Sequence, residues 1–105
     1  MKIIQQSHAG TLESGDVLIR IQPIDSHQVE IELESVVEKQ FGDAIRRLIH
    51  DTLHKLSIEG VRVIVEDKGA LDCVIRARVQ AALIRATGTQ LLAQISDDIQ
   101  TKGLD

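Results

Sequence analysis

Several residue types that mark common functional classes are scarce in this chain of 105 residues. It has one cysteine, Cys73, so it can form neither a disulfide within the chain nor a cysteine-rich zinc site. It has one aromatic residue, Phe41, so it lacks the stacking surfaces that bind single-stranded nucleic acids. A single thiol is typical of a reducing compartment, and we expect a cytoplasmic protein.

Charge and hydropathy exclude further classes. Asp and Glu number 16 against 12 Lys and Arg, so no net positive field attracts nucleic acid. No apolar run approaches the roughly 20 residues needed to cross a membrane. Residues 1–10 are too polar for a signal peptide. The length suits one domain, which we expect at residues 1–88, followed by a tail at residues 89–105 that forms a short helix or frays.

Two segments near the N-terminus alternate apolar and polar residues, as half-buried strands do. They are residues 16–22 and residues 29–34, and Pro23 ends the first because it has no N–H to donate. We expect them to form an antiparallel hairpin, with Arg20 near Glu30 or Glu32. Residues 2–4 are a candidate for a further short strand.

Two helices and another strand follow. Ser35 and Glu38 match a capping box, which predicts a helix from there to about residue 56. Residues 61–66 are a β-branched strand, and a second helix is expected over residues 70–87, closed by Gly88. The order ββαβα predicts an α+β fold, a two-layer sandwich in which two helices cover a small antiparallel or mixed sheet made of a β-hairpin plus a further strand. The first helix should bury an apolar stripe: Phe41, Ala44, Ile45, Leu48, Ile49, Thr52, Leu53 and Leu56. The stripe expected on the second helix is Leu71, Val74, Ile75, Val79, Ala82, Leu83 and Ala86.

The turn at residues 10–16 presents one hydroxyl, that of Ser14, between Glu13 and Gly15. Gly15 leaves one side of the serine uncrowded, and Asp16 adds a second acidic flank. Such a turn often only begins a strand. A serine presented in this way also suits covalent modification by another protein, with Glu13, Gly15 and Asp16 supporting the attachment loop.

Other chemically capable residues give weaker patterns. His50 and His54 have metal-binding spacing on one helix, but they fall on its solvent face without a third ligand nearby in sequence, so no metal site is expected. Cys73 near a helix start could act as a thiol nucleophile, although a small, partly buried cysteine is the simpler interpretation. We therefore expect no catalytic residues.

Three arginines, Arg76, Arg78 and Arg85, surround the apolar stripe of the second helix. Their stems can simply cover apolar surface. As a basic patch on an acidic protein, they can instead contact a phosphate group or a partner subunit.

Three segments together resemble a known family: AGTLESGD at residues 9–16, SVVEKQFG at residues 35–42 and DKGALDCVIRAR at residues 67–78. They resemble the acyl carrier protein, or gamma subunit, of bacterial citrate lyase, over about residues 1–88. Ordinary four-helix acyl carrier proteins place their serine in an Asp-Ser-Leu helix start. This chain has Glu-Ser-Gly followed by strands, so that fold is not expected.

The resemblance implies that Ser14 attaches phosphoribosyl-dephospho-coenzyme A through a phosphodiester. The thiol of this arm would carry acetyl and citryl groups between the acyl-transferase (alpha) and lyase (beta) subunits, after a prosthetic-group transferase had loaded it. The chain itself would be non-catalytic.

Three alternatives stay open. The first is the acyl carrier subunit of malonate decarboxylase, which uses the same arm. The second is an unmodified interaction or scaffold module, and the third is an enzyme that uses Cys73.

Overall fold

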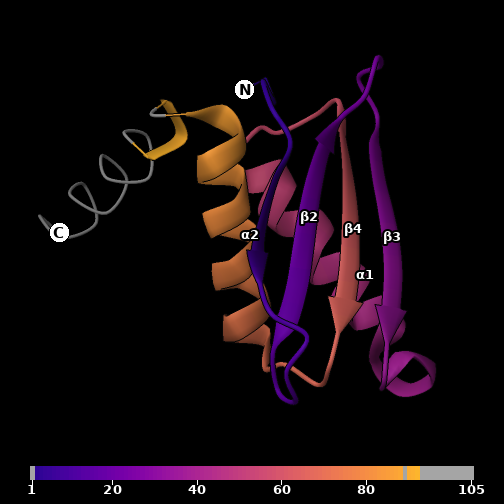
Figure 1. Ribbon diagram of the computed structural model, residues 1–105. Helices are drawn as coiled ribbons and strands as arrows, with labels where there is room; N and C mark the ends of the chain where they lie inside the picture. The colour runs from indigo at the N-terminus through magenta and orange to yellow at the C-terminus, as the bar shows by residue number, and fades with distance from the viewer. Residues whose placement is uncertain (1, 89, 93–105) are drawn as a thin grey trace, which may run out of the picture.

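The computed structural model describes residues 2–88 and 90–92 of the chain. The order of elements is β1 (Ser7–Gly10), β2 (Val17–Pro23), β3 (Val29–Ser35), α1 (Glu38–Lys55), β4 (Val61–Asp67) and α2 (Asp72–Thr87). One sheet forms one layer and the two helices form the other, so the predicted two-layer α+β sandwich is confirmed (Figure 1).

The sheet has the strand order β1-β2-β4-β3 and is mixed. β1 pairs antiparallel with β2, β2 pairs antiparallel with β4, and β3 pairs parallel with β4. The predicted hairpin between β2 and β3 is therefore wrong, because β4 lies between them. The hairpin in this fold is β1–β2, and the turn that carries Ser14 connects its strands.

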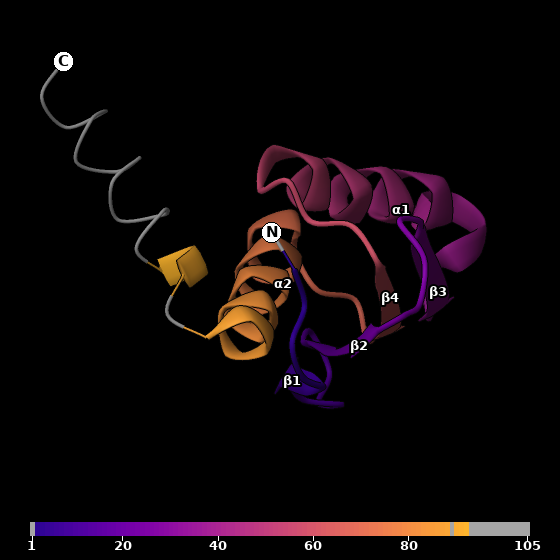
Figure 2. The same cartoon turned by 90° about the horizontal axis from the view of Figure 1, so that it is seen from above.

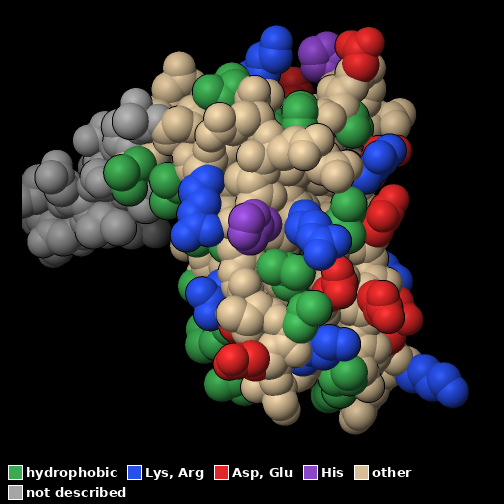
Figure 3. Space-filling view, in the orientation of Figure 1, with side chains coloured by type: hydrophobic (Ala, Val, Ile, Leu, Met, Phe, Trp, Pro, Cys, Tyr) green, Lys and Arg blue, Asp and Glu red, His purple; other side chains and the backbone are tan. Residues whose placement is uncertain are grey.

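Side-chain pairs on the uncovered face of the sheet follow this order. Arg20 pairs with Glu66 on β4 at 3.4 Å, not with Glu30 or Glu32 as predicted. Arg62 on β4 binds Glu30 instead, with its Nη2 3.1 Å from Oε2. Figure 3 looks onto this face, where acidic, basic and apolar side chains are interspersed.

Both helices cover the same face of the sheet, with α2 against β1 and β2 and α1 against β3 (Figure 2). The alternation of β2 and β4 explains the core, because every second residue of each strand points at the helices. The fully buried side chains of the two strands are Val17, Ile19, Ile21, Val61, Val63 and Val65. They pack against buried helix residues that include Ile45, Ile49, Leu53, Ile75, Val79 and Leu83.

The predicted capping box at the start of α1 is wrong. The helix begins at Glu38 after Val37, and no side chain caps it. The Ser35 hydroxyl donates a 2.7 Å hydrogen bond to Asp67 Oδ2 at the end of β4. Ser35 ends β3, and a buried carboxylate on the neighbouring strand is the acceptor that its hydroxyl can reach.

The two ends of the described chain differ from the predictions in smaller ways. Residues 2–4 form no strand, and Lys2 makes only an isolated bridge to Glu59. Residues 90–92 are helical, and Leu91 is fully buried with the core. A domain ending at residue 88 stays a prediction, and most of the expected tail lies outside the described residues. Among the described residues, no helix is long and apolar enough to cross a membrane.

Candidate functional site

Ser14 lies on the exposed turn between β1 and β2. The turn is closed by a 3.0 Å hydrogen bond from the backbone N–H of Asp16 to the carbonyl of Glu13. Thr11, Leu12, Glu13, Ser14 and Gly15 are all exposed, so no buried apolar side chain anchors this segment. Its shape therefore depends on polar contacts.

Two backbone hydrogen bonds join the turn to the loop that follows β4. The N–H of Gly15 donates to the carbonyl of Lys68 at 2.8 Å, and the N–H of Lys68 donates to the carbonyl of Asp16 at 2.9 Å. These bonds extend the pairing of β2 with β4 past the ends of both strands. The residue on the C-terminal side of Ser14 is thus fixed to the sheet.

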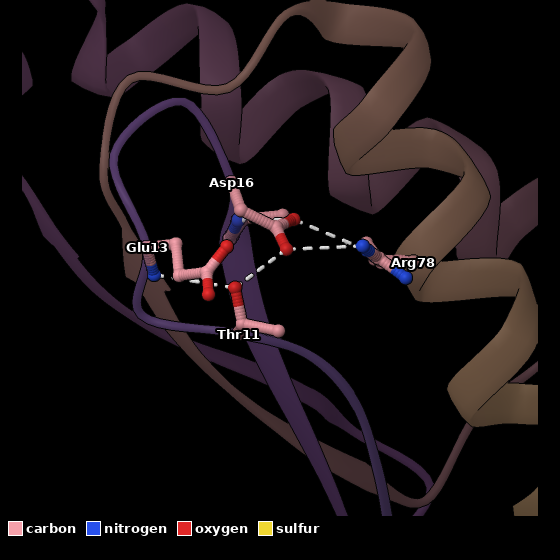
Figure 4. Close-up of polar contacts among 5 residues, drawn as sticks. Thr11, Glu13, Asp16 and Arg78 are labelled. Atoms are coloured by element: carbon pink, nitrogen blue, oxygen red, sulfur yellow. Dashed lines mark hydrogen bonds and ion pairs between the residues drawn. The ribbon is translucent and has the colours of Figure 1, made fainter.

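The Asp16 carboxylate ties the turn to α2 and also binds Thr11 within the turn (Figure 4). Arg78 binds it with both ends of its fork, Nε to Oδ1 at 3.1 Å and Nη2 to Oδ2 at 3.0 Å. Thr11 donates its hydroxyl to Oδ2 at 2.7 Å, and the backbone N–H of Val17 donates to Oδ1 at 2.7 Å. The bonds from Arg78, Thr11 and Val17 favour the charged form and lower the pKa of Asp16 from 3.8 to about 2.

The surroundings of Ser14 fit a covalently attached group. Its side chain makes no hydrogen bond to another described residue, so its oxygen is free to react. Gly15 has a φ of +82°, and a Cβ added there would meet nothing within 4 Å. Space is therefore open at Gly15, the residue next to Ser14.

The predicted residues of the attachment loop lie together in the structure. The structure brings Glu13, Gly15 and Asp16 together with Ser14, and it adds Thr11 and Lys68, which sequence analysis missed. For Thr11, the only signal in the sequence was its short spacing from Asp16 within one turn. Lys68 gave none, since its backbone rather than its side chain makes the contact.

The three arginines make different contacts. Arg78 is bound to Asp16, and Arg85 donates to the carbonyl of His8 on β1. Arg76 is exposed and makes no hydrogen bond or ion pair to another described residue. Contact of these side chains with a phosphate or a partner stays a prediction.

Histidines gather near the opposite end of β4. His27, His50 and His54 line one small hollow of about 160 Å³ with Glu59, which His27 contacts at 3.2 Å. His50 and His54 are exposed, as the helix pattern predicted. Among the described residues, no group of three or more His, Cys, Asp or Glu side chains is placed to hold a metal ion.

Cys73 is exposed rather than partly buried, which corrects the sequence interpretation. It lines an open, mainly apolar pocket of about 630 Å³ between the N-terminal ends of α1 and α2. Phe41, Ala44 and Leu71 also line this pocket and are exposed, Phe41 to 47% and Leu71 to 70%, so their predicted burial is wrong. Phe41 and Ala44 lie near the start of α1, and Leu71 directly precedes α2.

Comparison with known proteins adds a family and a fold. A family model described as ACP, malonate decarboxylase delta subunit (MdcD), matches residues 4–86. The fold resembles a chain in the crystal structure of a Pseudomonas malonate decarboxylase hetero-tetramer in complex with malonate, with a TM-score of 0.65, 15% identity, and coverage of 82% of this chain and 92% of that one. A second structure, from Thermus thermophilus, aligns with a TM-score of 0.46 and 17% identity, over 81% of this chain and 16% of that one.

Proposed function

Because the chain belongs to the acyl carrier protein family described as the malonate decarboxylase delta subunit, we propose that it is the acyl carrier subunit of a multi-subunit complex. Ser14 bears the prosthetic group, and the chain supplies no catalytic residue. The partners that act on the carried group are other subunits, and the complex is cytoplasmic.

The observation that carries this proposal is the presentation of Ser14. Ser14 is exposed, the space at its neighbour Gly15 is open, and the turn is fixed to the folded domain on the C-terminal side of Ser14. No catalytic group near it is needed, since a separate transferase loads a carrier. Glu13 adds an exposed negative charge that partners can recognise.

The group that we propose is phosphoribosyl-dephospho-coenzyme A, joined to Ser14 Oγ as a phosphodiester. When bound, it supplies a thiol on a long arm, on which acyl groups are carried as thioesters. Tethering keeps that thiol at high local concentration near each partner's active site. Ser14 would hold the arm, and the open side at Gly15 would leave room for its phosphate.

Two complexes are candidates for the partners. The family description supports malonate decarboxylase, whose carrier is the delta subunit. The segments at residues 9–16, 35–42 and 67–78 resemble the citrate lyase gamma subunit, which supports citrate lyase alpha and beta subunits. The structural match at 15% identity supports the fold and does not decide between them.

Intact mass tests the attachment site. The chain produced with its prosthetic-group transferase should gain the mass of one arm, and peptide mapping should place it on Ser14. Ser14→Ala should abolish the gain, whereas Ser26→Ala, in the exposed loop after β2, should leave it unchanged. A wild-type chain of unaltered mass under these conditions would overturn the proposal.

Reconstitution decides between the two complexes. The loaded chain is mixed separately with the malonate decarboxylase subunits and with the citrate lyase alpha and beta subunits, and release of carbon dioxide or oxaloacetate is measured. Activity that depends on Ser14 in one mixture identifies the partners. Full activity with Ser14→Ala would instead support the unmodified scaffold module.

A further inference from the structure

The contact between Asp16 and Arg78 is the longest-range side-chain link to the Ser14 turn among the described residues. It joins residues 62 positions apart, from the start of β2 to the middle of α2. Two parallel N–H···O bonds fix both the distance and the relative orientation of the Arg78 guanidinium and the Asp16 carboxylate, because the guanidinium fork matches the two carboxylate oxygens.

Gly10 lies beside the stem of Arg78. A Cβ at Gly10 would lie 3.4 Å from Cδ of Arg78 and only 1.8 Å from the carbonyl oxygen of Val17. The arginine stem therefore passes close to the last residue of β1, where no side chain stands. A side chain at this position would clash with the Val17 carbonyl and not with Arg78.

The pair contributes little to holding the two layers together. The Arg78 side chain is 41% exposed, and an ion pair at such a site stabilises a fold by only about 0–1 kcal/mol. The layers are held by the buried residues of β2, β4 and both helices. The effect of the pair is local, since the turn has no apolar anchor of its own.

We propose that Arg78 is a positioning residue for the modification of Ser14, acting through Asp16. This inference rests on the proposed function. In loading, Ser14 Oγ bonds to the phosphorus of an activated phosphate donor and the phosphoanhydride bond from that phosphorus to the donor's leaving phosphate breaks. The leaving phosphate takes the electron pair of that bond, and the hydroxyl proton passes to the transferase. The contacts of Asp16 with Arg78 hold the backbone of the turn in one shape, so the transferase need not order the segment first.

The test measures the loading rate of four variants with the chain's transferase. Arg78→Met should lower kcat/KM by about tenfold or more, the scale of a misplaced reacting atom. Arg78→Lys should fall between wild type and Arg78→Met, because lysine keeps the charge but loses the fork. Arg47→Met and Arg47→Lys, at an exposed position on α1 to which no role in binding is assigned, are the matched controls and should load normally.

Amide hydrogen exchange on the unloaded chain separates positioning from general stability. In Arg78→Met, the amides of Gly15 and Lys68 should exchange faster, while those of β2, β4 and α2 stay protected. Wild-type loading rates in both Arg78 variants would overturn the inference, as would a loss of protection spread evenly over the sheet. If the wild-type chain itself accepts no arm at Ser14, the proposed function fails instead.

Discussion

At the scale of single residues, Asp16 connects three parts of the molecule. Its carboxylate accepts from Arg78 on α2, from Thr11 beside β1 and from the first N–H of β2. Each oxygen receives two of these bonds, so the carboxylate has one orientation. A residue two positions after Ser14 thus fixes the turn on which that serine lies.

The acid response of Asp16 follows from its lowered pKa. The pKa of Asp16 is about 2 in the folded state, below its ordinary value of 3.8. The charged carboxylate therefore stabilises the fold at pH values above 3.8, and this stabilisation is lost as the pH falls toward the folded-state pKa. The difference in urea midpoint between wild type and Asp16→Asn should be constant near neutral pH and shrink between about pH 4 and about pH 2. A difference that stays constant down to the lower pH would contradict this expectation.

Two glycines of the turn should respond differently to alanine. Gly10→Ala should cost about 3–4 kcal/mol, because a Cβ would overlap the Val17 carbonyl and φ is +97°. Gly15→Ala should cost only about 1–2 kcal/mol, since its φ of +82° is strained for alanine but the space is open. Chemical denaturation measures both, and equal losses would show that Gly10 is not a close contact.

The sequence predicted the turn and its serine because glycine and acidic residues mark a turn locally. It could not predict the partner of Asp16, since no local pattern connects residues 62 positions apart. Arg78 was instead grouped with Arg76 and Arg85 by helical position. The packing of α2 against β1, which the sequence does not show, is what gives the three arginines different contacts.

At the scale of elements, β4 is the central feature, because both β2 and β3 pair with it. Alternation predicted each strand and its buried face, but it did not identify the neighbours. The one sequence signal for a central strand is Ile64, which makes the outer face of β4 partly apolar. β1 was missed because Ser7–Gly10 is short and has no alternating apolar pattern.

A double-mutant cycle tests the strand order. Arg62→Ala and Glu30→Ala should show a coupling of about 0.2–1 kcal/mol, as expected for a cross-strand ion pair. Arg20→Ala and Glu30→Ala should show none, because β4 separates their strands. Denaturant unfolding of the single and double mutants gives both coupling energies. Coupling in the second cycle alone would support the predicted pairing of β2 with β3 instead.

The start of α1 gives another contrast. Ser35→Ala should cost about 1.5–3 kcal/mol, because it removes a hydrogen bond to the buried Asp67 carboxylate. Glu38→Ala should cost less than about 1 kcal/mol, since Glu38 only makes an exposed pair with Arg46. Thermal unfolding distinguishes them, whereas a true capping box would make both losses similar.

At the scale of the whole molecule, the core extends past the end of α2. Leu91 is fully buried, although it lies beyond the residues matched by the family model. Leu91→Ala should therefore cost about 2–4 kcal/mol, as for other buried leucines. Leu92→Ala, at a position 49% exposed, should change stability by less than about 1 kcal/mol. Denaturation curves that coincide for the two variants would show that the domain ends before Leu91.

The Ser14 turn lies early in the chain, but Lys68 and Arg78, which fix it, come much later. During synthesis, a nascent chain in which α2 has not yet been made lacks Arg78, so the contact that holds Asp16 and the Ser14 turn is absent. A transferase that recognises the turn as Arg78 holds it would therefore not modify an incomplete chain. Under the proposed function, Ser14 would thus be loaded only after α2 has been synthesised and packed.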